Sequence, residues 1–463
     1  MLVEKQLLRN HSDTPRSSSS EITKFDAQQN LLLPGLTGSS KNVSPSRWFQ
    51  PLGSVVGQDS EISSRKLRVA LYSHDTMGLG HKRRNLLIAQ ALACSPLQTD
   101  ILLITGMREG SDVPTPDGVD YVALPALHKG KDGQYQSRRL NLLLRDIITL
   151  RANIIRATVE SFRPDVLIVD NVPRGAVREL DLTLEYIHAQ GHTRCVLGLR
   201  DVLDDPITIQ REWKHAANED IIRKYYDRVW VYGDPNVYDP VQEYNFSPDI
   251  AAKVCYTGCF DQCKRLEFAS TQSPDPLAAL ELPSGRLALC LVGGGQDGAT
   301  LAEAFAEANL PPETNGVVLT GPFMPQKVRQ RLHHIAAEHS RLRVLEFISE
   351  PTQLLSRADC VIAMGGYNTT YEILSFEKPA LIVPRVKPRR EQLIRAERLQ
   401  ELGLVDVLQP NEVNPYALTK WIGRSIGLNP RSRDRIDFNG LERLPQLLAA
   451  VVAAPVSSLH KAS

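Results

Sequence analysis

Residues 364–372 read MGGYNTTYE and join the apolar run Asp359–Met364 to a helical pattern. The run has the length of a buried strand, and the two glycines permit a tight turn before the helix. Main-chain amides at the start of a helix are unpaired and lie at its positive end, so they suit phosphate oxygens. The stretch therefore predicts a strand, a ligand-binding turn and a helix. In the structural alternative, Asn368 or Thr369 merely caps the helix.

A second glycine turn in the same half makes the ligand interpretation more specific. Residues 291–300 read LVGGGQDGAT and again lie between an apolar run and a helical pattern. Three consecutive glycines cost backbone entropy unless the chain must bend sharply or approach something closely. No Gly-Lys-Ser/Thr follows, so this is not a Walker A loop.

A third turn lies in the first half of the chain. Residues 73–84 read SHDTMGLGHKRR and follow the first apolar run. A dinucleotide fingerprint would need a third glycine after Gly78 and Gly80, and none is present. This argues against a nicotinamide site. A strand-to-helix turn without any ligand remains the alternative.

Short apolar runs alternate with longer helical patterns from Leu67 onward, as a parallel sheet with crossover helices requires. A polar, proline-containing stretch separates two such series, so we predict two α/β units joined near residues 265–285. Apolar stripes predict helices over His81–Cys94 and Leu140–Phe162. The expected strands are residues 68–74, 100–106, 121–125, 165–170, 194–199, 228–233, 253–258, 287–292, 316–320, 342–347, 359–364 and 380–383.

The composition is that of an ordinary globular protein. The chain has 463 residues, with 54 Lys plus Arg against 53 Asp plus Glu, a balance that argues against a nucleic-acid partner. Seven cysteines do not make a disulfide framework in so long a chain, which favours a reducing cytoplasm. No apolar run reaches membrane-spanning length, so we expect a soluble protein.

The two ends of the chain differ from the middle. Residues 1–66 contain the run Ser17–Ser20, few aromatics and no apolar period, so we expect a disordered extension. The stretch Ile436–Ala454 predicts a packed helix, and a peripheral membrane contact is the alternative.

Three cysteines are spaced four residues apart, at Cys255, Cys259 and Cys263. On a helix this spacing would align three metal ligands. Gly258 and the strand-like Val254–Thr257 argue against a helix there, and no Cys-x-x-Cys pair supports zinc. We therefore expect no metal site.

Taken in order, these elements resemble the GT-B glycosyltransferases, specifically glycosyltransferase family 28 and a bacterial branch of predicted family-28-type transferases. The likeness is strongest at residues 365–372 and at Pro379–Arg398, covers roughly residues 67–450, and is looser in the N-terminal half. It implies an α/β fold with two Rossmann-like domains facing across a cleft. The acceptor domain would be residues 67–270 and the donor domain residues 285–430, with a final helix in residues 431–463 packing back.

The resemblance places a nucleotide-sugar donor, usually UDP-linked, in the C-terminal domain. The Gly293–Gly298 turn would lie against the diphosphate, Glu372 would accept hydrogen bonds from the ribose, and Glu391 with Gln392 would face the sugar. Arg385 lies in a basic segment that can stabilise anionic groups or form a solvated loop. The expected donor-binding residues are Gly293, Gly294, Gly295, Gln296, Asp297, Gly298, Gly365, Gly366, Asn368, Thr369, Glu372, Arg385, Glu391 and Gln392.

The Gly78–His81 turn matches the family's glycine-rich first loop, which makes His81 the candidate catalytic base. A histidine suits this role because its pKa lies near the operating pH, although a first-turn helix residue that bonds the backbone is the alternative. Asp75 and Asp201 are the other candidate catalytic residues. The acceptor-side candidates are Gly78, Gly80, Asp170, Asn171 and Arg200. A local turn cap competes for Asp170-Asn171, and an internal ion pair for Arg200-Asp201.

The family's diphosphate loop typically has serine where Gln296-Asp297 stands, and its acceptor loops are not recognisable in this chain. No Asp-x-Asp motif occurs either. We therefore expect an inverting transferase that needs neither metal nor cofactor and moves a hexose or N-acetylhexosamine from a nucleotide sugar to a hydroxyl. The acceptor is open, either lipid-linked or a small metabolite, and the location is cytoplasmic or peripheral at the inner membrane face. The rival functions are a nucleotide-sugar epimerase or hydrolase with acidic catalytic residues, and a non-catalytic nucleotide-sugar-binding protein.

Overall fold

The computed structural model describes residues 65–75, 80–106, 115–130, 134–268, 276–348 and 350–454. All of them belong to one compact unit. The expected extension at residues 1–66 lies outside the described residues, apart from its last two. The described part of the chain contains no helix long and apolar enough to span a membrane.

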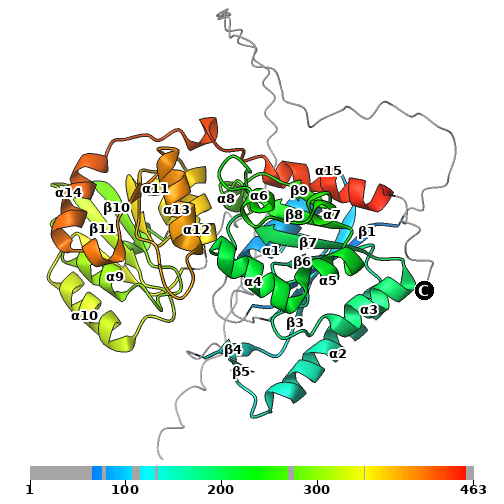
Figure 1. The fold of residues 1–463 in the computed structure, drawn as a ribbon. Helices are drawn as coiled ribbons and strands as arrows, with labels where there is room; N and C mark the ends of the chain where they lie inside the picture. Colours follow the sequence, from blue (N-terminus) through cyan, green and yellow to red (C-terminus); the bar gives the residue numbers. More distant parts are fainter. Residues whose placement is uncertain are drawn as a thin grey trace, which may run out of the picture. The chain divides into compact units, whose positions relative to one another are not determined.

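The first sheet is parallel, with the strand order β3-β2-β1-β6-β7-β8-β9 (Figure 1). Its central strands are rich in Val, Ile and Leu and are buried on both faces, because crossover helices cover both sides. The strands are β1 (Leu67–Ser73), β2 (Thr99–Thr105), β3 (Val119–Ala123), β6 (Val166–Asp170), β7 (Arg194–Arg200), β8 (Arg228–Tyr232) and β9 (Val254–Tyr256). The helices are α1 (Gly80–Ala93), α2 (Leu144–Phe162), α3 (Asp181–Gln190), α4 (Pro206–Ala216), α5 (Asn218–Tyr225), α6 (Pro240–Glu243), α7 (Pro248–Ala251) and α8 (Lys264–Phe268).

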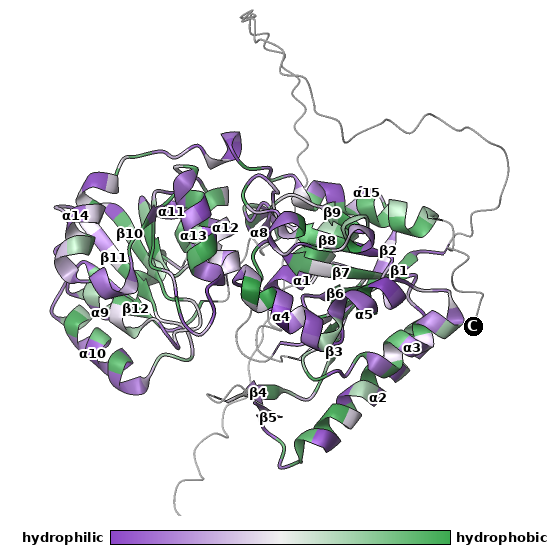
Figure 2. Ribbon diagram, in the orientation of Figure 1, coloured by the Kyte–Doolittle hydropathy of each residue, from purple (hydrophilic) through white to green (hydrophobic). Residues whose placement is uncertain are grey.

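The second sheet is also parallel and has the order β12-β11-β10-β13-β14-β15. Its strands are β10 (Arg286–Leu291), β11 (Thr314–Leu319), β12 (Leu342–Leu345), β13 (Cys360–Ala363), β14 (Ala380–Ile382) and β15 (Asp406–Val407). The helices are α9 (Ala299–Ala306), α10 (Gln326–Ala337), α11 (Thr352–Arg357), α12 (Tyr367–Ser375), α13 (Glu391–Glu401) and α14 (Pro415–Ser425). Figure 2 shows the hydrophobic residues concentrated in the strands. We call β1–β9 with their helices the N-terminal lobe, and β10–β15 with theirs the C-terminal lobe.

Both sheets have the topology that creates a ligand site. β1 lies between β2 and β6, and β10 lies between β11 and β13. At such a position the loops after two neighbouring strands lead to opposite faces of the sheet, which opens a crevice at their carboxyl ends. The switch points are therefore β1/β6 in the N-terminal lobe and β10/β13 in the C-terminal lobe.

The last helix, α15 (Gly440–Ala453), returns to the N-terminal lobe (Figure 1). Leu441, Leu444 and Leu448 are buried in the same hydrophobic cluster as Leu87 of α1. Each fully buried leucine contributes about 1.5–3 kcal/mol, so this packing fixes the chain end against the first sheet.

The predicted α/β class and the predicted strands are confirmed, with ends that differ by a few residues. An antiparallel hairpin of β4 (Leu127–Lys129) and β5 (Tyr135–Ser137) was not predicted, because strands of three residues are too short to show a period. α2 begins at Leu144 and not at Leu140. Leu140, which the apolar stripe counted as helical, is an exposed residue of the preceding loop.

Candidate active site

His81 and Asp170 meet at the N-terminal switch point. His81 lies in the first turn of α1, after β1, and Asp170 is the last residue of β6. His81 Nδ1 is 2.5 Å from Asp170 Oδ2. A carboxylate can only accept, so the tautomer with its proton on Nδ1 satisfies this contact and has a free lone pair on Nε2. Arg84 Nη2 lies 3.0 Å from the same Nδ1. The His81 side chain is 22% exposed and that of Asp170 is 0% exposed, so the imidazole can reach a substrate while its partner cannot.

Arg84 completes this arrangement from one helical turn further along α1. Its Nη2 donates to both carboxylate oxygens of Asp170, at 2.6 and 2.7 Å. Burial alone would raise the pKa of Asp170, but Arg84 and His81 together hold it well below its usual range. Asp170 is therefore a fixed anion beside the imidazole. Burial and the neighbouring His81 lower the pKa of His74, whose ring centroid is 4.6 Å from that of His81, so His74 stays neutral.

The two glycine turns of the C-terminal lobe lie at neighbouring strand ends. Leu291 of β10 pairs with Ala363 of β13, and each strand leads directly into its turn. Gly298 is the N-cap of α9 and Gly366 is the N-cap of α12. One edge of the sheet therefore presents two helix N-termini with unpaired amides at the second switch point, as a diphosphate site requires. Neither Asn368 nor Thr369 caps α12, since the cap has no side-chain hydrogen bond.

The first of these turns needs glycine for steric reasons. Gly295 has a φ of +88°, and a Cβ there would lie 2.2 Å from the carbonyl oxygen of Thr320. At Gly366 a Cβ would meet nothing within 4 Å, and the φ of −63° suits any residue.

Gly295→Ala is therefore expected to lower the free energy of unfolding by about 1–3 kcal/mol, because of the strained backbone and the clash. Gly366→Ala, the matched control, should leave it within about 0.5 kcal/mol. Urea unfolding of both variants and the parent measures the difference. Equal stabilities would contradict the steric account of this turn.

The two switch points are in direct contact. The Asn368 amide at the start of α12 donates to the Gly80 carbonyl at the start of α1, at 3.0 Å. Tyr367 donates its hydroxyl to the carbonyl of Tyr232, at 2.7 Å. The second glycine turn therefore contacts Gly80, the residue that directly precedes His81 in α1.

Glu372, which the resemblance implies as a ribose-binding carboxylate, forms an ion pair in this structure. Its Oε1 accepts from Arg83 Nη2 at 2.9 Å, and the same nitrogen reaches Glu350 at 3.0 Å. The Glu372 side chain is 4% exposed. In this arrangement the carboxylate joins α12 to α1, and a ribose would have to displace Arg83 to reach it.

Both candidate aspartate bases accept hydrogen bonds from other side chains of the protein. Asp75 is 1% exposed, and its Oδ2 accepts from the hydroxyls of Ser73 and Thr105. Asp201 is 0% exposed and is held by Arg395 through two hydrogen bonds of 2.8 and 2.7 Å. Tyr371 also donates to it. Both oxygens of Asp201 are engaged, so the geometry does not favour it as the base. The Oδ1 atom of Asp75 has no hydrogen-bond partner among the described residues, but burial shields it from solvent.

The donor-side residues after β14 form their own network. Arg385 donates to Glu391 through Nη2, and its backbone N–H donates to the Gln392 side chain at 3.0 Å. Arg385 Nη1 is also 3.6 Å from Asp297 Oδ2, which ties the first glycine turn to the start of α13. Gln296 is exposed at the same turn. These residues are brought together, as the resemblance implies, but Arg385 is paired with protein carboxylates.

The remaining acceptor-side candidates lie at the carboxyl ends of the first sheet. Gly78 lies outside the described residues. Asn171 follows β6 with a φ of +68°, and its buried Oδ1 has no partner. Arg200 ends β7, and it does not form the ion pair with Asp201 that the sequence left open, since Asp201 is bound to Arg395.

Arg84 and Arg395 were not among the residues predicted for the site. Arg84 lies three residues after His81, a spacing that places both on one helix face, so the helical pattern contained this signal. Arg395 has no such signal, because its partner Asp201 lies in the other lobe, 194 residues away.

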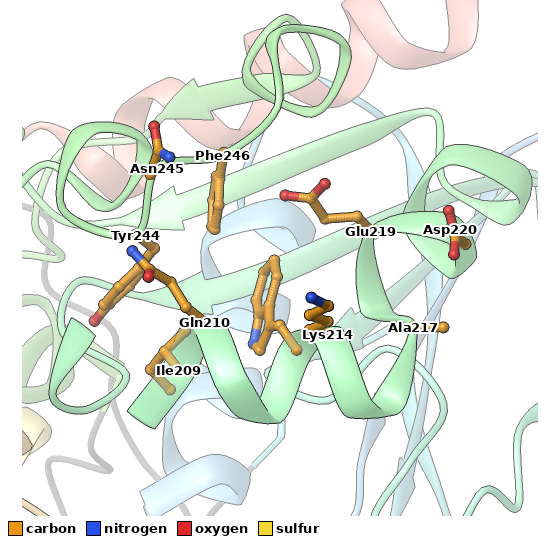
Figure 3. A pocket seen from close by; sticks show the side chains of 10 residues that line it. Ile209, Gln210, Lys214, Ala217, Glu219, Asp220, Tyr244, Asn245 and Phe246 are labelled. Atoms are coloured by element: carbon orange, nitrogen blue, oxygen red, sulfur yellow. The ribbon is translucent and has the colours of Figure 1, made fainter. Parts of the chain in front are cut away.

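A surface pocket of about 380 Å³ lies apart from both switch points, between α4, α5 and residues 244–246. Figure 3 shows Phe246 at this pocket. Trp213 of α4 also lines it, and its ring stacks on that of Phe246 at 4.8 Å between centroids. Among the described residues, no group of three or more His, Cys, Asp and Glu side chains is placed to hold a metal ion.

Residues 288–432 match the model of the glycosyltransferase family 28 C-terminal domain. The UDP-N-acetylglucosamine--N-acetylmuramyl-(pentapeptide) pyrophosphoryl-undecaprenol N-acetylglucosamine transferase of Clostridium botulinum is 29% identical over 111 residues, or 22% of this chain and 31% of that protein. An uncharacterized glycosyltransferase of Methanosarcina acetivorans is 26% identical over 250 residues, or 53% of this chain and 60% of that protein. The chain thus spans about a third of the length of the first relative.

Solved structures of two kinds share the fold. The glycosyltransferase SnogD from Streptomyces nogalater aligns with a TM-score of 0.51 and 16% identity, covering 84% of this chain and 100% of that one. A putative UDP-N-acetylglucosamine 2-epimerase from Listeria monocytogenes aligns with a TM-score of 0.53 and 15% identity, covering 84% and 96%. The chain therefore has the GT-B fold, and its C-terminal lobe matches the glycosyltransferase family 28 C-terminal domain.

Proposed function

We propose that this protein is an inverting glycosyltransferase that moves a hexose or N-acetylhexosamine from a UDP-sugar to a hydroxyl acceptor without a metal ion. One observation carries the proposal. The His81–Asp170 pair at the first switch point lies beside the glycine turn of the second, through the 3.0 Å contact of Asn368 with Gly80. At this distance the candidate base and the glycine turn suited to a diphosphate can act on the same acceptor and donor.

In this mechanism His81 Nε2 removes the proton from the acceptor hydroxyl as its oxygen attacks the anomeric carbon. The sugar–diphosphate bond breaks on the opposite side, so the configuration inverts. Asp170, buried and ionised, stabilises the imidazolium that forms, as a fixed charge does in a site of low dielectric. The N-termini of α9 and α12 stabilise the leaving diphosphate through their main-chain amides.

The epimerase or hydrolase alternative has less support, although an epimerase shares the fold. That chemistry needs acidic residues available to the sugar. Asp170, Asp201 and Glu372 each form an ion pair with an arginine in this structure. The paired acids suit a protein in which histidine is the base.

A donor panel tests the proposal. Thermal unfolding is measured with UDP, UDP-N-acetylglucosamine, UDP-glucose, GDP-mannose and dTDP-glucose, with and without EDTA. We expect stabilisation by the UDP compounds, about 2.7 kcal/mol at a ligand concentration of 100 Kd, and no effect of EDTA. The GDP- and dTDP-sugars are the matched controls. A protein stabilised by none of them, or only when a divalent cation is added, would overturn the proposal.

A further inference from the structure

Arg200 lies where the two lobes meet and forms no ion pair with any residue that the structure describes. It ends β7, is half-buried, and its buried Nε has no hydrogen-bond partner among the described residues. Its guanidinium senses the charges of Arg84 in one lobe and of Arg395 and Glu391 in the other. It therefore lies between the N-terminal base and the C-terminal donor turns.

The carboxylates around Arg200 form their ion pairs with other arginines. Asp170 is bound by Arg84, and Asp201 is bound by Arg395. Glu391 is bound by Arg385 through Oε1, and its buried Oε2 has no hydrogen-bond partner among the described residues. Burial lowers the pKa of Arg200, and repulsion by Arg84 and Arg395 lowers it further. A buried charge is costly unless an opposite charge and hydrogen bonds compensate it. Glu391 and Asp201 attract Arg200, but no described residue forms a hydrogen bond with its buried Nε.

Polar atoms at the neighbouring strand ends also lack hydrogen-bond partners among the described residues. β1, β6, β7 and β8 are adjacent in the first sheet. His74 Nδ1, just after β1, Asn171 Oδ1, just after β6, and the Tyr232 hydroxyl at the end of β8 are buried polar atoms without partners. Buried polar groups are nearly always hydrogen-bonded. Such groups, gathered with Arg200 at one edge of the sheet, indicate a polar ligand that completes them.

We propose that Arg200 binds a phosphate group of a substrate held between the two lobes. The guanidinium is a planar fork that donates two parallel hydrogen bonds to phosphate oxygens. The phosphate comes either from the donor diphosphate or from a phosphorylated acceptor. The choice between these sources rests on the proposed function; the anion site itself does not.

The experiment compares Arg200→Gln, Arg200→Lys and the parent protein. Arg211→Gln is the matched control, because it removes one exposed arginine from the same lobe on α4. Thermal unfolding is recorded without ligand, with inorganic phosphate, with UDP, and with phosphate at saturating UDP. Calorimetry gives the UDP dissociation constants.

Without ligand, Arg200→Gln should unfold at or above the temperature of the parent, because an uncompensated charge is gone. Its affinity for inorganic phosphate should fall about 10- to 100-fold, the range for a hydrogen-bonded charged pair. Arg200→Lys should fall between the two, since it keeps the charge without the fork, and Arg211→Gln should behave like the parent. These results support the site.

The source of the phosphate follows from the two UDP arms. A matching loss of UDP affinity in Arg200→Gln assigns the site to the donor diphosphate. Unchanged UDP affinity, with phosphate stabilisation at saturating UDP lost, assigns it to the acceptor. If Arg200→Gln responds to phosphate and UDP like the parent, or the parent responds to neither, the inference is overturned. A parent that binds phosphate through Arg200 but no nucleotide would overturn only the proposed function.

Discussion

His81→Ala is expected to lower kcat for glycosyl transfer by about 10²- to 10⁴-fold, the usual contribution of a general base. The affinity for UDP should be unchanged, because in the proposed mechanism the imidazole acts on the acceptor hydroxyl and the C-terminal lobe binds the donor. Release of UDP from the donor identified in the panel gives kcat, and calorimetry gives the dissociation constant. Equal activity of the variant and the parent would remove His81 from the mechanism.

Asp170→Asn should reduce kcat by a similar factor. An asparagine amide can donate as well as accept, so it no longer enforces the proton on Nδ1, and the charge that stabilises the imidazolium is gone. His192→Ala is the matched control, because His192 Nε2 lies 3.5 Å from Asp165 in a surface His–Asp pair. It should leave kcat unchanged. A similar loss in His192→Ala would show that the effect is not specific to the proposed base.

Arg395→Met is expected to cost about 3–5 kcal/mol of unfolding free energy, the range for removing one partner of a buried ion pair. Asp201 would stay buried and charged, with Tyr371 as its main side-chain partner. Arg395 Nη1 also donates to the Gly365 carbonyl at 3.1 Å, so the same variant should weaken donor binding. Urea unfolding and calorimetry with UDP measure the two effects.

The control for this variant lies on the same helix. Arg398 of α13 also bridges the lobes, to Glu243 at 2.8 Å, but its side chain is 42% exposed. Exposed ion pairs contribute little, so Arg398→Met should cost at most about 1 kcal/mol. The double variant Arg395→Met with Asp201→Asn should recover part of the loss, because no unpaired charge remains. Equal costs for Arg395→Met and Arg398→Met would contradict a buried interlobe pair.

Much of the fold could be predicted from the sequence, because its signals are local. Apolar runs of strand length mark the parallel strands, and glycine turns such as Gly293–Gly298 mark their carboxyl ends. His81 could be singled out because it follows such a turn at the start of a helix. The hairpin of β4 and β5 could not be predicted, because strands of three residues are too short to show a periodicity.

The ion-pair partners of the charged site residues could not be predicted from the sequence. Asp170 was predicted as an acceptor-side residue, and its partner His81 lies 89 residues away. Glu372 was predicted to bind ribose, and in the structure it pairs with Arg83, 289 residues away. Asp170 ends a strand and Glu372 lies within a helix. The sequence shows these positions but does not show the partner of either carboxylate.

The sequence by itself therefore determined two Rossmann-like sheets, the turns at their switch points and the histidine beside the first. The tertiary structure alone decided which carboxylates are neutralised, because it brings arginines of α1 and α13 against them. It also decided that Arg200 forms no ion pair with a described residue. The physical reason is the separation along the chain over which each interaction acts. Backbone propensity and apolar periodicity act within one element, whereas an ion pair depends on where two elements, hundreds of residues apart, come to lie.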